Sequence, residues 1–148
     1  MSDLRDLYQE IILDHTRHPR NFGPLAGANR SAEGHNPLCG DQIKVYLDLA
    51  DGVVRGIGFE GAGCAISTAS ASLMTEELRG RSQEEAQALF QKFHRLLTVG
   101  DGVDDPALES LAVFSGVREY PMRVKCATLA WHTLKAALEG EDLPVSTE

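Results

Sequence analysis

The sequence predicts an α+β fold in which a small antiparallel sheet packs against helices, and three observations support this prediction. Two segments of alternating polarity flank Asp51-Gly52, a dipeptide typical of a β-hairpin turn. Segments before and after the hairpin repeat their apolar residues at helical spacing. The chain has 148 residues, 43% of them hydrophobic and 24% charged, which suits one globular domain. We expect this domain to span residues 1–140 and residues 141–148 to form a flexible tail.

Five helices are predicted from apolar spacing and from signals at their ends. The first has Ser2 as its capping residue and ends before Pro19. Ser82 and Glu85 form a capping box at the start of a central helix, and Gly140 ends the last helix. Residues 115–121 are expected to be irregular. The predicted helices cover residues 2–18, 65–80, 82–97, 105–114 and 122–138.

The predicted sheet consists of the hairpin and a third strand with a weaker pattern. Apolar residues from Ile43 to Leu49 alternate with polar ones, which indicates a half-buried strand. Residues 53–59 form the returning strand. Residues 28–34 are expected to add the third strand, after a loop over residues 20–25 that contains Pro and Gly.

Charge and hydropathy narrow the class of function. The formal net charge is -8 and no block of Lys and Arg occurs, so the chain lacks the basic footprint that nucleic acid or an anionic membrane requires. No apolar run approaches the roughly 20 residues that span a bilayer, and the acidic start is unlike a signal peptide. Three cysteines cannot all pair within one chain. We therefore expect a cytoplasmic protein with free thiols.

The three cysteines, together with one aspartate, form a candidate metal site. Cys39 lies just before the first hairpin strand and Cys64 just after the second, so the hairpin should bring Cys64 close to Cys39 and Asp41. Cys126 falls near the start of the last helix and could face the same point. Three thiolates and a carboxylate would close a four-coordinate site. The spacing alone leaves open the alternative of three buried, free cysteines.

The contexts of these cysteines resemble the iron–sulfur cluster assembly family of the IscU and NifU N-terminal type. The resemblance rests on three ordered motifs, and residues 7–23 are also similar to the first helix and loop of that family. Within the family, the chain is most similar to the SufU branch, because Lys125 stands where the scaffold branch has a histidine and because residues 97–120 resemble the longer SufU form. The motifs are Asn36-Pro37-Leu38-Cys39-Gly40-Asp41, Gly61-Ala62-Gly63-Cys64-Ala65-Ile66-Ser67 and Lys125-Cys126-Ala127.

The resemblance implies a function and a role for each site residue. The SufU branch is a zinc-bound sulfurtransferase that takes persulfide sulfur from a cysteine desulfurase of the SufS type and passes it to downstream cluster-assembly proteins. The resemblance implies that Cys39, Asp41, Cys64 and Cys126 hold Zn²⁺ and that Cys39 accepts the sulfur. Two alternatives are a scaffold that carries a transient iron–sulfur cluster on the same cysteines, and a zinc-stabilised adaptor of the desulfurase without catalytic activity.

Two chemical expectations complete the predicted site. Three thiolates and one carboxylate around Zn²⁺ carry excess negative charge, and Arg123, about one helical turn before Cys126, is the candidate cation that supports the site. Because Cys39 lies on a loop, we expect it to leave the metal when a partner supplies a replacement ligand such as a histidine. His35 is close to Cys39 in sequence, but a solvent-exposed histidine is the simpler interpretation. We expect His15 to be a structural residue at the end of the first helix, where a cation suits the helix dipole.

Overall fold

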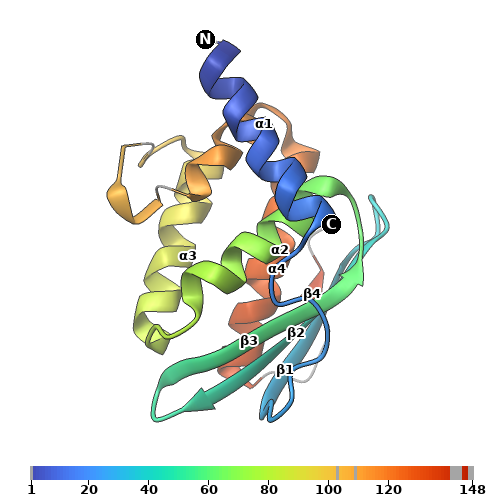
Figure 1. Ribbon diagram of the computed structural model, residues 1–148, viewed down its shortest axis with the longest axis vertical. Helices are drawn as coiled ribbons and strands as arrows, with labels where there is room; N and C mark the ends of the chain where they lie inside the picture. The colour runs from blue at the N-terminus through green and yellow to red at the C-terminus, as the bar shows by residue number, and fades with distance from the viewer. Residues whose placement is uncertain (1, 103, 109, 141–144, 147–148) are drawn as a thin grey trace.

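The computed structural model describes residues 2–102, 104–108, 110–140 and 145–146, and it has the predicted α+β architecture. The sheet has the strand order β3-β2-β1-β4. Figure 1 shows helices α2 and α4 against the sheet, with α1 and α3 farther out. The strands are β1 (Arg30–Asn36), β2 (Asp41–Ala50), β3 (Val53–Ala62) and β4 (Val145–Ser146).

The hairpin is the central element of the sheet. β2 and β3 pair antiparallel through the two-residue loop Asp51-Gly52, whose residues have positive φ of 53° and 74°. Positive φ at both positions matches the right-handed twist of the strands, and a two-residue loop fixes their register. The predicted third strand is confirmed as β1, which pairs antiparallel with β2 and runs two residues farther, to Asn36. That extension brings Asn36 opposite Asp41.

Both edges of the sheet are partly covered. Val145 and Ser146 form β4, a short parallel strand beside β1, and the flexibility expected of residues 141–148 stays a prediction. The other positions of that tail lie outside the described residues. At the opposite edge, residues 21–23 bond to Phe59 in β3, although the sequence predicted only a loop there. Partial cover of this kind limits the edge that a second chain could pair with.

The helices agree with the predicted ones except between residues 106 and 119. Two 3₁₀ helices replace the single short helix, and the second includes most of the segment that was expected to be irregular. The capping box of α3 is present, because Ser82 Oγ accepts the Glu85 N–H at 3.1 Å and Glu85 accepts the Ser82 N–H at 2.9 Å. The helical segments are α1 (Ser2–Arg17), α2 (Ala65–Leu78), α3 (Gln83–Thr98), η1 (Pro106–Leu108), η2 (Leu111–Glu119) and α4 (Pro121–Glu139).

The hydrophobic core lies between the inner face of the sheet and the helices. Trp131 in α4 is fully buried and its ring lies 4.9 Å from that of Phe93 in α3. Its indole N–H donates to Ser70 Oγ in α2 at 3.2 Å. α4 therefore joins the sheet to both α2 and α3, and its N-terminal half carries Cys126 to the end of the sheet where β1 gives way to β2.

His15 occupies a polar position between the helices that the sequence did not predict. We expected His15 to sit as a cation at the end of α1, but it is buried and its Nδ1 lies 2.7 Å from Ser72 Oγ in α2. Burial is the main cause that lowers the pKa of His15, and the charge of Arg20 adds to it. The neutral imidazole therefore ties α1 to α2.

Candidate metal centre

The turn between β1 and β2 holds Cys39 and Asp41. Asn36 and Asp41 are the last pair of the β1–β2 ladder, and four residues join them. The Asn36 carbonyl accepts the N–H groups of Cys39 at 3.2 Å and Gly40 at 2.8 Å, and Gly40 has a φ of 77°. Only glycine adopts that backbone conformation without steric cost. Cys39 is exposed on this turn, whereas Asp41 is only 1% exposed.

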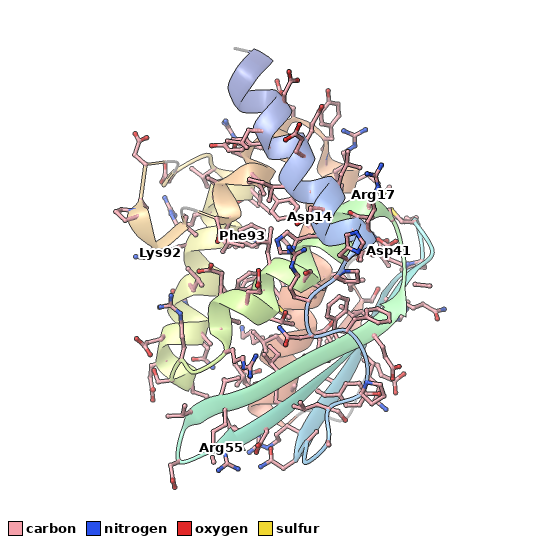
Figure 2. All side chains as sticks on the ribbon, in the orientation of Figure 1. Asp14, Arg17, Asp41, Arg55, Lys92 and Phe93 are labelled. Atoms are coloured by element: carbon pink, nitrogen blue, oxygen red, sulfur yellow. The ribbon has the colours of Figure 1, made fainter. Side chains whose placement is uncertain are left out.

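Cys64 stands at the start of α2, as predicted. It is the N-cap residue, and its sulfur accepts the Ser67 N–H at 3.4 Å. The Cys64 N–H in turn donates to Asp41 Oδ1 at 2.8 Å, and the Cys64 sulfur lies 3.8 Å from Asp41 Oδ2. The free N–H groups and dipole of a helix N-terminus stabilise negative charge on a thiolate. Figure 2 shows Asp41 where α2 begins, near the C-terminal end of α1.

Cys126 completes the cluster from the side of α4. It is 3% exposed, and its sulfur lies 3.3 Å from the sulfur of Cys39. One ligand atom from each of Cys39, Asp41 and Cys126 falls within 4.8 Å of the others. Cys64 adjoins this group through Asp41 and through its interaction with the thiol of Cys126. The structure thus brings together the four residues that the sequence predicted as ligands.

The charges of the cluster indicate that it is built for a cation. Burial raises the pKa of the Cys126 thiol far above its ordinary value, and contacts with Asp41, Cys39 and Cys64 raise it further. Asp41 is buried, yet among the described residues it forms no ion pair with a Lys, Arg or His. A buried carboxylate without a positive charge to balance it is costly. A divalent cation would balance it, and soft thiolates with one carboxylate suit Zn²⁺.

The expected supporting residues lie around the cluster but do not join it. The Arg123 guanidinium lies over the ring of Tyr120, 4.6 Å from its centroid, and within the described part of the chain it neither ion-pairs with nor hydrogen-bonds to the four predicted ligands. Its supporting role stays a prediction. The Lys125 side chain likewise has no such contact among the residues described. His35 is exposed in β1, next to the buried Asn36, and so belongs to the opposite face of the strand.

Asn36 and Gly63 also contribute to the site, although neither was predicted from the sequence as an individual contributor. The fully buried Asn36 directs its amide group at Cys39, with Nδ2 at 3.6 Å from the sulfur. Gly63 leaves room for the carboxylate, because a Cβ there would lie 2.7 Å from Asp41 Oδ1. Both residues belong to the motifs around the cysteines. Their position next to Cys39 and Cys64 was the signal that could have marked them.

The fold and this cluster together define a class of protein: small α+β domains that gather three cysteines and an aspartate at one end of a sheet. Comparison with known families identifies the class, because the family described as "NifU-like N terminal domain" matches residues 7–127. The chain belongs to this family of iron–sulfur cluster assembly proteins. Among the residues that the structure describes, no helix is long and apolar enough to cross a membrane.

Individual relatives carry two different names. The chain is 43% identical over 138 residues to "Iron-sulfur cluster assembly scaffold protein IscU" of Thermotoga maritima, covering 93% of this chain and 96% of the relative. It is 36% identical over 141 residues to "Zinc-dependent sulfurtransferase SufU" of Bacillus subtilis, covering 95% of each. The crystal structure of a NifU-like protein from Brucella abortus superposes with a TM-score of 0.83 at 27% identity, covering 93% of this chain and 95% of that one.

Proposed function

We propose that the protein binds Zn²⁺ through Cys39, Asp41, Cys64 and Cys126 and accepts sulfur on Cys39 from a cysteine desulfurase of the SufS type. It then passes this sulfur to downstream cluster-assembly proteins in the cytoplasm. One observation carries the proposal: an exposed cysteine sulfur lies 3.3 Å from that of buried Cys126, next to a buried carboxylate that lacks a cation among the described residues. The name of the Bacillus subtilis relative supports the same role.

The residues of the site have different roles in holding the metal and in accepting sulfur. When bound, Zn²⁺ keeps thiolates deprotonated at neutral pH and contributes no redox chemistry of its own. Asp41 is held by the Cys64 N–H, and Cys64 and Cys126 belong to the ends of two packed helices. Cys39 stands on an exposed turn between two strands. Cys64 is exposed as well, but it caps α2, so Cys39 is the thiolate that can leave the metal with the least disturbance of a helix.

The transfer itself is a thiol exchange. The Cys39 thiolate attacks the outer sulfur of the desulfurase persulfide, and a new sulfur–sulfur bond forms on Cys39. The sulfur–sulfur bond of the donor breaks, and the desulfurase cysteine leaves as a thiolate. One sulfur atom moves between two cysteines without net oxidation, so the step needs no further oxidant or reductant.

A second candidate function is the assembly of a transient iron–sulfur cluster on the same cysteines. The relative from Thermotoga maritima supports it, since that protein is named a scaffold and matches along almost its whole length. Iron and zinc share thiolate ligands. The two functions differ in what the protein holds when it is isolated.

Metal analysis and mass spectrometry test the proposal together. Protein isolated without added metal should contain about one zinc per chain and no visible chromophore. Iron with visible absorption and little zinc would instead establish the scaffold. After incubation with a SufS-type desulfurase and cysteine, mass spectrometry of the peptides should find added sulfur on Cys39. Sulfur only on Cys64 or Cys126 would overturn the assignment.

Three matched substitutions separate metal binding from transfer. Cys39→Ser should retain the fold and part of the metal but lose turnover with the desulfurase. Cys64→Ser and Cys126→Ser should lose metal as well, because these residues anchor the site in α2 and α4. Full transfer by Cys39→Ser would rule out Cys39 as the acceptor. Bound zinc without any transfer in the unaltered protein would leave the adaptor function.

A further inference from the structure

Asn36 contacts the sulfur of Cys39 through a fully buried amide group. Its Nδ2 lies 3.6 Å from Cys39 Sγ, within hydrogen-bond reach of a sulfur acceptor. The orientation of the amide is determined independently, because the Leu38 N–H donates to Asn36 Oδ1 at 3.1 Å. An N–H group can donate only to the oxygen, so the nitrogen must face the cysteine.

The backbone of the turn does not depend on this contact. The Asn36 carbonyl already accepts the N–H groups of Cys39 and Gly40, and Asn36 pairs with Asp41 in the ladder. Oδ1 adds one further bond to the turn. For Nδ2, the described residues offer one hydrogen-bond partner, the sulfur of Cys39. A buried N–H group without a partner costs roughly 1–3 kcal/mol, so this donor is matched to the sulfur.

We propose that Asn36 is a positioning residue for the reactive sulfur: its amide donates a hydrogen bond to Cys39 Sγ and sets the direction and electron density of that sulfur. This inference rests on the proposed function, in which Cys39 accepts sulfur. A hydrogen bond to a thiolate draws electron density from the sulfur and partly balances its charge. The bond therefore steadies the Cys39 thiolate on its exposed turn while another protein approaches.

The three cysteines differ in the donors they receive. Cys64 accepts a backbone N–H from Ser67, which is fixed by the start of α2. Cys126 has no N–H donor among the described residues, and its thiol meets the sulfur of Cys39. Cys39 alone of the three has a side-chain N–H donor in the part of the chain that the structure describes. The N–H donor to the Cys39 sulfur can thus be removed by a substitution at position 36 without the loss of a backbone hydrogen bond in a helix.

Asn36→Ser tests the inference, with Asn29→Ser as the matched control. Serine at position 36 can still accept the Leu38 N–H but is too short to reach the sulfur. Asn29 also uses its amide to bind backbone, contacting Leu49 N and O at 2.9 and 2.7 Å, far from the cysteines at the other end of the β1–β2 pair. Both changes remove an asparagine that braces the same pair of strands.

The first measurement is the absorption spectrum of the cobalt-substituted protein. Loss of the hydrogen bond raises the electron density on the sulfur, so the sulfur-to-cobalt charge-transfer band should move to longer wavelength in Asn36→Ser and stay in place in Asn29→Ser. Sulfur transfer from the desulfurase should fall about 10-fold in Asn36→Ser, the lower range for loss of a group that orients a metal ligand. An unmoved band, or an equal shift in both variants, would overturn the role of Asn36.

A second measurement uses the unaltered chain, so that the inference stays testable if Asn36→Ser does not fold. In protein loaded with a spin-active cadmium isotope, NMR should detect a coupling between cadmium and a side-chain amide proton of Asn36, transmitted through the sulfur. Absence of this coupling, with the metal bound, would refute the hydrogen bond. Neither spectrum depends on sulfur transfer. A shifted band or a detected coupling without any transfer would therefore support the Asn36 contact and reject the proposed function.

Discussion

Gly63→Ala should disturb the metal centre through a single contact. The added Cβ would lie 2.7 Å from Asp41 Oδ1, and Gly63 has no positive φ that would add backbone strain. An ordinary carbon–oxygen contact is about 3.3 Å, so the carboxylate must retreat by about 0.6 Å. Overpacking of this kind costs about 1–3 kcal/mol. We expect zinc affinity to fall by about 10- to 100-fold, as for other groups that orient a ligand.

Gly116→Ala is the matched control, because no atom lies within 4 Å of a Cβ at that position and its φ is ordinary. Competition with a chromophoric chelator would measure the zinc affinity of both variants. Thermal melting of the metal-free proteins would separate loss of stability from loss of affinity. Equal zinc affinity in Gly63→Ala and Gly116→Ala would refute the argument that the space beside Asp41 is part of the site.

Three further predictions concern the rest of the molecule. Chelation of zinc should lower the melting temperature but leave the far-ultraviolet helix signal, because the aromatic core around Trp131 does not include the ligands; an unchanged melting temperature would mean that no metal was bound. His15 has a lowered pKa in the folded state, so the unfolded chain binds more protons as the pH falls below about 6.5, and stability is lost there. Urea unfolding at about pH 5 and about pH 7.5 should show this loss of stability. His15→Gln should remove the share of the loss that is due to His15, while the share due to His132, whose pKa is also lowered, remains. An unaltered pH dependence of stability in His15→Gln would contradict the role of His15. Gly34→Ala would place a Cβ 2.1 Å from Thr133 Oγ1 and should cost about 1–3 kcal/mol in unfolding experiments while the zinc content per chain stays the same; a normal stability would show that Thr133 moves aside freely.

The elements that the sequence predicted best are those encoded within a few residues. Asp51-Gly52 determines a turn by its own conformational preference, and Ser82 caps α3 together with Glu85, three positions away. The pair Val145 and Ser146 carries no such local signal, because its pairing with β1 depends on residues distant in the sequence. His15 was misjudged for the same reason. Burial where α1 packs on α2, a helix distant in the sequence, is the main cause that lowers its pKa, and the end of its own helix does not decide its charge.

The candidate metal centre likewise combines features that depend on nearby residues with features that depend on residues distant in the sequence. Cysteine is a distinctive ligand, and a hairpin returns the chain to its starting point, so Cys39, Asp41 and Cys64 could be grouped before the structure was known. The amide contact of Asn36 and the space left by Gly63 depend on how the turn and the start of α2 meet. Such contacts follow only from the folded arrangement.

The four proposed zinc ligands come together at different times as a chain is made. The hairpin that joins Asp41 to Cys64 pairs neighbouring segments, and such local contacts form early because little chain entropy is lost. Cys126 joins them only when α4 packs against β1, β2 and α2. Synthesis proceeds from the N-terminus, so a nascent chain carries two thiolates and a carboxylate before the third thiolate is in place. A ribosome-bound chain that still lacks α4 thus holds an incomplete set of the proposed ligands, and we expect the docking of this helix to make the newly synthesised protein competent to bind zinc.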